Sequence, residues 1–251
     1  IFGKEDMNKS KALQNILPWL VAALVVVILI LAAVRLLLFP WFPALEYRMP
    51  GFPDDPYGFT LEQRLEYSRL SVEYLINDAD ISFLGDLRFP DGQHAPPSSC
   101  LPPEDCTRLF NDRELEHMLD VKLTVRAAMW VLLGAMVLLL GLRIWARRGG
   151  WLEIYFRGLE RGGWLTVITI VTVLLFVALA FNVIFVAFHQ VFFQAGTWTF
   201  PTSDTLIRLF PERFWQDTFL FLVLLAGGMG VGLGLWMRKI RLSSAKTSPT
   251  K

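Results

Sequence analysis

The chain has 251 residues, of which 54% are apolar, and it carries a formal net charge of +1 at pH 7. Its apolar share exceeds the roughly 45–50% of soluble globular domains, and its mean hydropathy is +0.44. The sequence contains neither a basic patch for nucleic acid nor a Gly-rich phosphate-binding loop, which excludes those two functional classes. The class of the protein is then decided by how the apolar residues are distributed.

Four apolar segments are candidates to cross a membrane. Three of them contain no charged residue: 12–34, 162–188 and 218–237. Each reaches the roughly 20 residues that a helix needs to cross about 30 Å of hydrocarbon. The fourth segment, 127–142, is shorter, but Arg126 and Arg143 flank it and their long side chains can reach the two interfaces. The sequence therefore predicts an all-α integral membrane protein with four transmembrane helices and an extracytoplasmic cap of helices and loops.

The predicted parts follow one another from a tag remnant before the first Met to a cytoplasmic tail. Their boundaries are 1–6 for the tag remnant, 12–39 for the first span, 40–122 for an extracytoplasmic domain with an amphipathic helix at 61–77, 123–145 for the second span, 146–162 for a cytoplasmic loop, 163–189 for the third span, 190–216 for an extracytoplasmic loop, 217–238 for the fourth span and 239–251 for the tail.

Charge predicts the orientation of these spans. Lys and Arg gather before the first span, between the second and third, and after the fourth. Between residues 41 and 125, by contrast, 16 Asp and Glu stand against 7 Lys and Arg. Because cytoplasmic loops are enriched in Lys and Arg, we expect both termini to be cytoplasmic.

Capping signals predict two helices in the extracytoplasmic domain. Thr60 and Gln63 form a T-x-x-Q capping box before an amphipathic stretch. Asn111 is a good N-cap for a second helix, with Glu114 at its third position. This second helix has no Pro or Gly before Gly134, so we expect it to run unbroken into the second span.

Three further local patterns give expectations. Apolar residues at helical spacing between 146 and 163 predict a short interfacial helix in the cytoplasmic connection. Ser203 or Thr202 is expected to cap a short helix through Leu209, which Pro211 ends. In the fourth span, two overlapping G-x-x-x-G motifs predict close helix packing: Gly228 with Gly232, and Gly230 with Gly234.

Both cysteines, Cys100 and Cys106, lie in a Pro- and Ser-rich stretch of the extracytoplasmic domain. That compartment is oxidising in many cells, so the two could form a local disulfide that staples the loop. A redox-active pair is the alternative interpretation.

Histidine is rare in this chain, and His117 and His189 are both predicted at the outer membrane interface. On its own helix, His117 has Asp120 three residues away, and His189 has Asn182 seven residues earlier on nearly the same face. The two histidines are either ordinary interfacial residues or members of one shared site, because polar residues within a membrane tend to face the bundle.

Other site chemistries find little support. A zinc site needs three or four ligands, and only the two histidines with Asp120 or His94 are available, so we expect no metal and no cofactor. The sequence contains no G-x-S-x-G motif and no Ser beside a plausible base, so a serine-hydrolase mechanism has no support.

Three segments carry a resemblance to a known family: PDDPYGFTLEQRLEYSRLSVEYL at 53–75, ELEHMLDVK at 114–122 and FHQVFFQAGTWTFPTSDTLIRLFPERFW at 188–215. Their order and spacing resemble the lipoprotein intramolecular transacylases (Lit), a family of four-span bacterial membrane proteins. The pieces H-M-x-D-V-K and F-H-x-x-F-F are the most specific. The loop from 89 to 106 has no counterpart in this resemblance.

The resemblance implies an acyltransferase in the bacterial cytoplasmic membrane, with its active site at the outer leaflet. Such an enzyme moves the sn-2 acyl chain of a diacylglyceryl-modified lipoprotein to the α-amino group of its N-terminal Cys, giving the lyso-form. Its implied partners are lipoproteins and membrane lipid, not nucleic acid. The resemblance places catalytic histidines at His117 and His189, and weaker supporting or substrate-binding roles at Asp120, Asn182, Trp198 and Asp204.

Two alternative functions, from other classes of membrane protein, compete with the transacylase interpretation. A thiol-quinone oxidoreductase generally requires two cysteine pairs and a C-x-x-C motif, whereas this chain has one pair spaced six residues apart. A non-catalytic membrane scaffold or partner-binding subunit is the second alternative.

Overall fold

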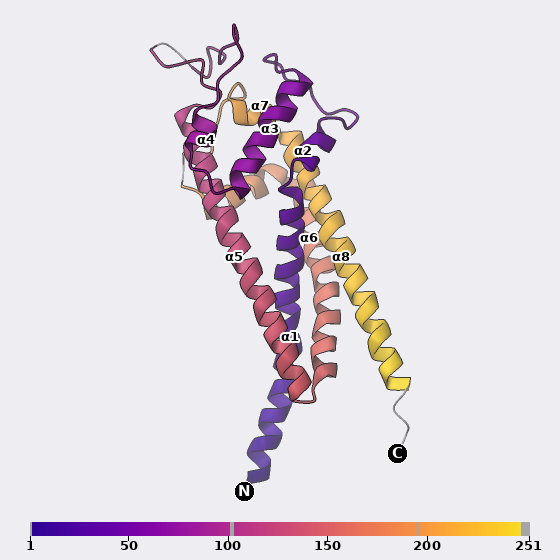
Figure 1. Cartoon of the computed structure of the whole chain (residues 1–251). Helices are drawn as coiled ribbons and strands as arrows, with labels where there is room; N and C mark the ends of the chain where they lie inside the picture. The colour runs from indigo at the N-terminus through magenta and orange to yellow at the C-terminus, as the bar shows by residue number, and fades with distance from the viewer. Residues whose placement is uncertain (1, 101–102, 195, 247–251) are drawn as a thin grey trace. The chain divides into compact units, whose positions relative to one another are not determined.

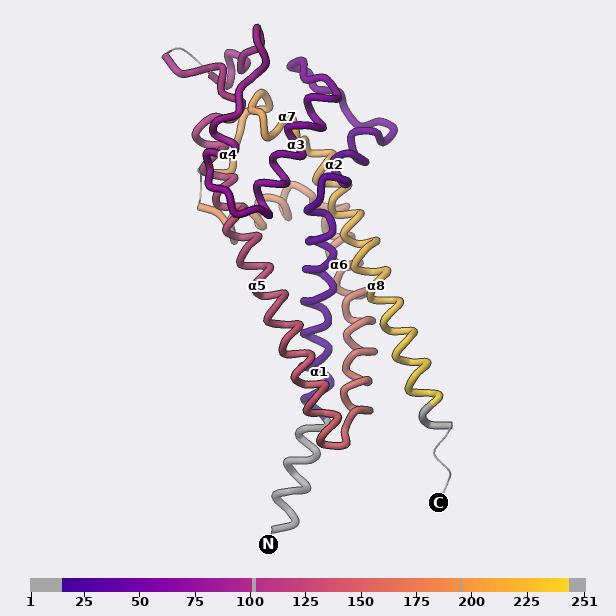
Figure 2. The backbone as a smooth tube through the Cα atoms, viewed as in Figure 1, coloured from indigo at the N-terminus to yellow at the C-terminus, as the bar shows by residue number. Residues whose placement is uncertain are grey.

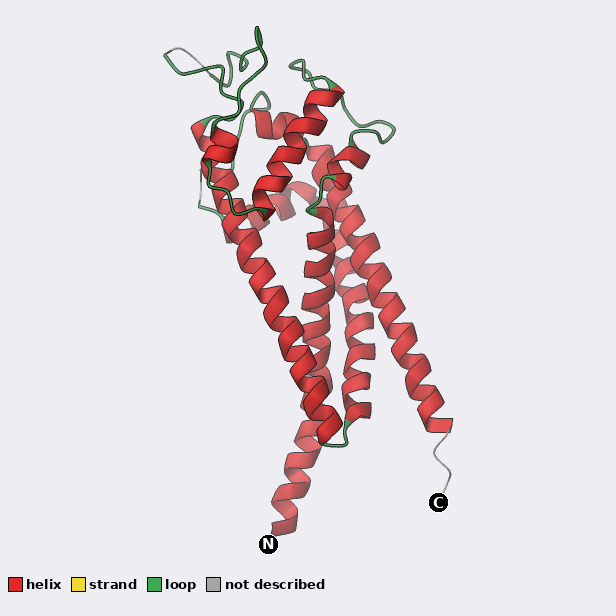
Figure 3. Cartoon of the chain, viewed as in Figure 1, coloured by secondary structure: helices red, strands yellow, loops and turns green. Residues whose placement is uncertain are grey.

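The structure is a computed structural model, and it describes residues 2–100, 103–194 and 196–246, with side chains described from residue 15 to residue 243. In these residues the secondary structure is helical, apart from an isolated bridge between Arg88 and Arg108 (Figure 3). The helices are α1 (Phe2–Leu37), α2 (Trp41–Glu46), α3 (Leu61–Ile76), α4 (Ser82–Gly85), α5 (Asp112–Arg148), α6 (Leu152–Phe192), α7 (Thr205–Leu209) and α8 (Glu212–Lys246) (Figure 1). The predicted all-α class is confirmed.

Four of these helices are long and apolar enough to cross a membrane: Asn15–Leu37 within α1, α5, α6 and Glu212–Ser243 within α8. The helix that begins after Asn111 runs unbroken into the second span, as predicted, because no Pro or positive-φ residue interrupts it. Of the tag remnant predicted at 1–6, Ile1 lies outside the described residues, as do 247–251 of the predicted tail.

The chain folds into two compact units. The first comprises Ile1–Val34, Met129–Leu175 and Phe221–Lys251, and the second comprises Arg35–Ala128 and Phe176–Leu220. The first unit therefore holds most of the apolar spans, and the second holds α2, α3, α4, α7 and the ends of the long helices that carry the candidate site residues.

In the first unit, glycines let the helix backbones approach one another. A Cβ built on Gly162 of α6 would lie 2.5 Å from the Val25 Cβ of α1, and one on Gly163 would lie 2.6 Å from the carbonyl oxygen of Gly230 in α8. Close packing at Gly230 and Gly234 is therefore confirmed. For Gly228 and Gly232 the prediction is wrong, because a Cβ on either would meet nothing within 4 Å.

The predicted cytoplasmic loop at 146–162 is mostly helical. The chain turns at Gly149 and Gly150, and Gly150 has a φ of +75° that favours glycine. Helix α6 begins at Leu152 and runs through Gly163 without a break (Figure 2). The expected interfacial helix is thus the first part of α6, because packing against α1 and α8 offsets the low helix propensity of the two adjacent glycines.

In the second unit, α3 and α4 pack over a core centred on Tyr74, Leu84, Phe110 and Leu209. The capping box predicted at the start of α3 is confirmed: Thr60 Oγ1 accepts from the Gln63 amide at 3.2 Å, and the Gln63 side chain accepts from the Thr60 amide at 2.9 Å. The helix ends at Ile76, one residue before the predicted boundary.

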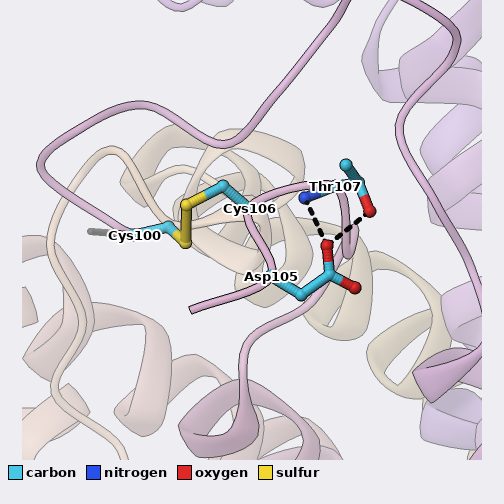
Figure 4. Close-up of a disulfide and its surroundings, with 4 residues drawn as sticks. All are labelled: Cys100, Asp105, Cys106 and Thr107. Carbon is cyan, nitrogen blue, oxygen red and sulfur yellow. Dashed lines mark hydrogen bonds between the residues drawn. A yellow bond between two sulfur atoms is a disulfide. The ribbon is translucent and has the colours of Figure 1, made fainter. Parts of the chain in front are cut away.

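The loop between α4 and α5 contains a disulfide between Cys100 and Cys106 (Figure 4). Beside it, an Asp105 side-chain oxygen accepts hydrogen bonds from the Thr107 hydroxyl at 2.6 Å and the Thr107 amide at 3.1 Å (Figure 4). These two bonds hold the pKa of the exposed Asp105 carboxyl below its ordinary value. The disulfide and the Asp105 turn together constrain the loop.

Candidate active site

The start of α5 is anchored from both sides, which fixes the position of His117 one turn later. Asn111 Oδ1 accepts from the Glu114 amide at 3.0 Å, and Glu114 Oε2 accepts from the Asn111 amide at 2.8 Å. The second oxygen of Glu114 accepts from the Leu206 amide in α7 at 2.7 Å. The buried Glu114 carboxyl therefore closes a capping box and also ties α5 to α7.

His189 lies in the last turn of α6, where its own helix orients the ring. His189 Nδ1 donates to the Phe185 carbonyl oxygen, one turn earlier, at 2.7 Å. A carbonyl oxygen can only accept, so Nδ1 carries the hydrogen. In the neutral ring, Nε2 then has the free lone pair, which is the nitrogen that can accept a proton.

The two imidazoles meet, although 72 residues separate them in the sequence. Their ring centroids lie 6.1 Å apart with an interplanar angle of 21°, and both residues are at least 91% buried. A group that exchanges a proton with a ring nitrogen must approach it within about 2.6–3.2 Å. One small reacting group can therefore contact both histidines at once.

Aromatic rings surround the histidine pair. Phe193 lies 5.0 Å from the His117 ring and 5.5 Å from the His189 ring, Phe200 lies 5.4 Å from His117, and Trp198 lies 4.9 Å from His189, all between centroids. Sequence reasoning gave neither phenylalanine a role in the site, although Phe193 is the last residue of the F-H-x-x-F-F piece. The helical spacing of Phe193 from His189 gave a weak signal, whereas the contact of Phe200 depends on the loop after α6.

Two polar atoms of this cluster are buried without a hydrogen-bond partner: His117 Nδ1 and Trp198 Nε1. Buried polar groups in proteins are nearly always paired, and leaving one unpaired typically costs about 1–3 kcal/mol. A donor and a ring nitrogen left unpaired in one aromatic enclosure fit a site that binds a polar group of a ligand.

The other predicted site residues lie apart from the pair. Asp120 is half-buried and Asn182 is exposed, and in the described part of the chain no hydrogen bond or ion pair joins either side chain to a histidine. His94 is exposed in the loop before the disulfide. Helix α6 departs from helical geometry at Ala180 (φ −150°, ψ 49°), two residues before Asn182.

Asp204 has a structural position instead. It is the N-cap residue of α7, so the predicted caps Ser203 and Thr202 are wrong, and its side chain makes no capping bond. Asp204 is buried, and one carboxylate oxygen lies 3.3 Å from Arg113 Nη2 of α5. The other carboxylate oxygen, Oδ1, is buried without a hydrogen-bond partner, so Arg113 offsets only part of the cost of burying this group.

The described residues contain no candidate metal site, because no group of three or more of their His, Cys, Asp and Glu side chains could hold an ion.

Comparisons with known proteins agree with this architecture. An uncharacterised protein of Aquifex aeolicus (strain VF5) is 28% identical over 195 residues, which cover 74% of this chain and 76% of the relative. Two solved structures of the membrane-integral lipoprotein intramolecular transacylase Lit from Bacillus cereus, each with one histidine replaced, share the fold. Their TM-scores are 0.72 and 0.70 at 18% identity, and they cover 98% and 97% of this chain and all of the solved chains.

The family model "Lipoprotein intramolecular transacylase Lit" matches residues 19–215 of this chain. This match includes most of the first membrane-length helix, all of α5 and α6, and both histidines of the pair. The protein therefore belongs to the Lit family of lipoprotein intramolecular transacylases and is a multi-pass membrane acyltransferase.

Proposed function

We propose that this protein moves the sn-2 acyl chain of a diacylglyceryl-modified lipoprotein to the α-amino group of the same lipoprotein's N-terminal Cys. The product would be the lyso-form, with an N-terminal amide and a free sn-2 hydroxyl. The observation that carries the proposal is the buried pair of His117 and His189, with ring centroids 6.1 Å apart inside an aromatic enclosure. Because the amine and the ester belong to one molecule, their proximity favours the attack.

His189 is assigned as the general base. Its Nδ1 is engaged by the Phe185 carbonyl, which leaves Nε2 as the proton acceptor. The α-amino nitrogen attacks the ester carbonyl carbon, a C–N bond forms, and Nε2 takes the proton that the nitrogen loses. An α-amino group has a pKa of about 7.7–8.0, so an imidazole is well matched to this transfer.

His117 is assigned to the departing glycerol oxygen. As the tetrahedral intermediate collapses, the bond between the acyl carbon and the glycerol oxygen breaks, and that oxygen needs one proton. Burial among aromatic rings favours the neutral form of His117, so the proton is the one that His189 Nε2 took from the amine, and the neutral His117 ring donates a hydrogen bond that stabilises the departing oxygen. The proton that leaves the amine therefore reaches the glycerol oxygen, and both rings are neutral again after the reaction.

Trp198 is assigned as the donor to the developing oxyanion. Its Nε1–H is buried without an acceptor beside the His189 ring. Such a donor, fixed before the substrate arrives, stabilises negative charge on the carbonyl oxygen more than it stabilises the neutral ester. The surrounding phenylalanines exclude water, which strengthens this interaction.

The site is proposed to act at the outer leaflet of a bacterial cytoplasmic membrane. Support comes from the Lys and Arg residues in the short connections, which predict cytoplasmic termini and an outer location for 40–122 and 190–216. In this topology the histidine pair would lie near the headgroups of a lipid-anchored substrate.

The test is to express the protein with a reporter lipoprotein and locate its acyl chains. Transfer within one molecule leaves the mass unchanged, so tandem mass spectrometry must show whether the N-terminal nitrogen carries an amide. The amide should appear only when the protein is present. A mixture of isotope-labelled and unlabelled lipoprotein should give no cross-labelled amide. An unmodified N-terminus in the presence of the folded protein would refute the proposal.

Histidine variants test the assigned site. His117→Ala and His189→Ala should each lower the rate of amide formation by about 10²–10⁴, whereas His94→Ala is a matched control because His94 is exposed in a loop. A folded His117→Ala or His189→Ala protein with a near-normal rate would remove that residue from the mechanism.

A further inference from the structure

A cavity lies in the first compact unit, and none of its lining residues belongs to the proposed acyl-transfer site. Its volume is about 410 Å³, and side chains of α1, α6 and α8 line it. The lining residues on which the argument rests are Trp19, Arg157, Glu160, Arg161, Trp164 and Arg241. All belong to the unit formed by 1–34, 129–175 and 221–251, so their mutual placement is defined.

The charge of this cavity is positive. Three arginines and one glutamate line it, an excess of two positive charges. Arg241 pairs with Glu160, and Arg157 lies 3.4 Å from the exposed Glu153 outside the cavity. Arg161 has no carboxylate partner within the described residues, and its guanidinium lies 4.9 Å from the Trp19 ring centroid.

The unpaired guanidinium of Arg161 points to an anion. A guanidinium has only N–H donors, so it needs an acceptor, and the described residues give Arg161 no carboxylate. Arg157 and Arg241 are partly exposed beside it, so their outer nitrogens can reach the same anion. The general enrichment of arginine on one side of a membrane does not explain the convergence of three arginines on one cavity.

The cavity lies where the apolar spans end. Arg161 directly precedes the uncharged run 162–188, and Arg241 follows the uncharged run 218–237 by four residues. The Trp164 indole packs on Gly234, where a Cβ would lie 3.0 Å from the ring. Seven residues beyond Arg161, and so on nearly the same face of α6, the lining residue Ile168 is 63% exposed. Tryptophans at this depth are typical of the membrane–water interface.

We propose that this cavity binds the headgroup of an anionic phospholipid. The arginines hold the phosphate, and the acyl chains run along α6 past Ile168 into the hydrocarbon. Basic cavities between transmembrane helices are suited to such headgroups. By the predicted topology, this lipid belongs to the cytoplasmic leaflet, so the site is separate from the acyl-transfer site.

The test measures lipid binding by native mass spectrometry of the full-length protein in detergent. Phosphatidylglycerol and phosphatidylcholine with identical acyl chains are titrated in parallel. Phosphatidylglycerol should bind more tightly, and Arg161→Gln should weaken it by about fivefold, the contribution of one arginine near a membrane surface. Arg147→Gln is the matched control, because Arg147 is exposed at the end of α5 and does not line the cavity. Unfolding temperatures in lipid-free detergent confirm that both variants fold.

A competition arm separates a lipid site from a simple anion site. Millimolar inorganic phosphate should fail to displace phosphatidylglycerol, because it lacks the acyl chains that contact α6. Equal affinity for the two lipids, equal loss in Arg161→Gln and Arg147→Gln, or full displacement by inorganic phosphate would each overturn the proposal.

Discussion

A buried carboxyl in α2 should make the stability of the second unit depend on pH. Glu46 is fully buried, and neither of its side-chain oxygens has a hydrogen-bond donor. The charged groups that act on it come from the start of α8: Asp217, and Arg213, whose Nε lies 2.5 Å from an Asp217 oxygen. Burial, together with the neighbouring Asp217, raises the pKa of Glu46 from 4.5 to about 7, although Arg213 opposes the shift.

The direction of the effect follows from which state holds the proton. Between pH 4.5 and about 7 the folded protein keeps a proton on Glu46 that the unfolded chain releases, so the free energy of unfolding falls as pH rises through this window. The difference between these two pKa values corresponds to about 3 kcal/mol. Glu46→Gln is neutral at every pH, so it should remove this loss and be the more stable protein above pH 7.

The assay is thermal unfolding of the full-length protein in detergent at a series of pH values between 4.5 and 8. The Tm of Glu46→Gln minus that of the wild type should grow with pH and level off above about 7. Glu62→Gln is the control, because Glu62 is exposed in the first turn of α3 and should give a difference independent of pH. Parallel curves for the wild type and Glu46→Gln would refute the reasoning.

Three further predictions concern the site, the disulfide and the helix packing. Trp198→Phe keeps an aromatic ring but lacks the buried N–H. Amide formation on the reporter lipoprotein should therefore slow by about 10²–10³, with little change in Tm. An unchanged rate would remove the indole from the mechanism. Replacing Cys100 and Cys106 together by Ser should leave the rate near that of the wild type, because the loop that they join contributes no residue to the aromatic enclosure of the histidines. Loss of activity in a folded variant would favour thiol chemistry. Gly163→Ala forces a Cβ to within 2.6 Å of the Gly230 carbonyl and should cost about 1–3 kcal/mol by thermal unfolding, whereas Gly228→Ala meets nothing and should cost none. Equal effects of the two would contradict the packing.

Local interactions explain what the sequence predicted correctly. Uncharged runs of membrane length are a property of the chain itself, since any exposed charge in hydrocarbon would be costly. The capping boxes at Thr60–Gln63 and Asn111–Glu114 involve residues three apart, so their geometry follows once the helix starts. For the helix at 205–209 the predicted cap was wrong, because the N-cap residue is Asp204. Asp204 pairs with Arg113, which is distant in the sequence, so a local pattern does not reveal its position.

By itself, the sequence determined the four spans, the starts of the two capped helices and the two histidines that are candidates for the active site. Only the tertiary structure decided that His117 and His189 share an enclosure, that Phe193 and Phe200 wall it, and that Asn182 stays outside it. The physical reason is distance along the chain: a ring-to-ring separation depends on how the ends of α5 and α6 pack, and periodicity within one helix carries no information about its neighbour.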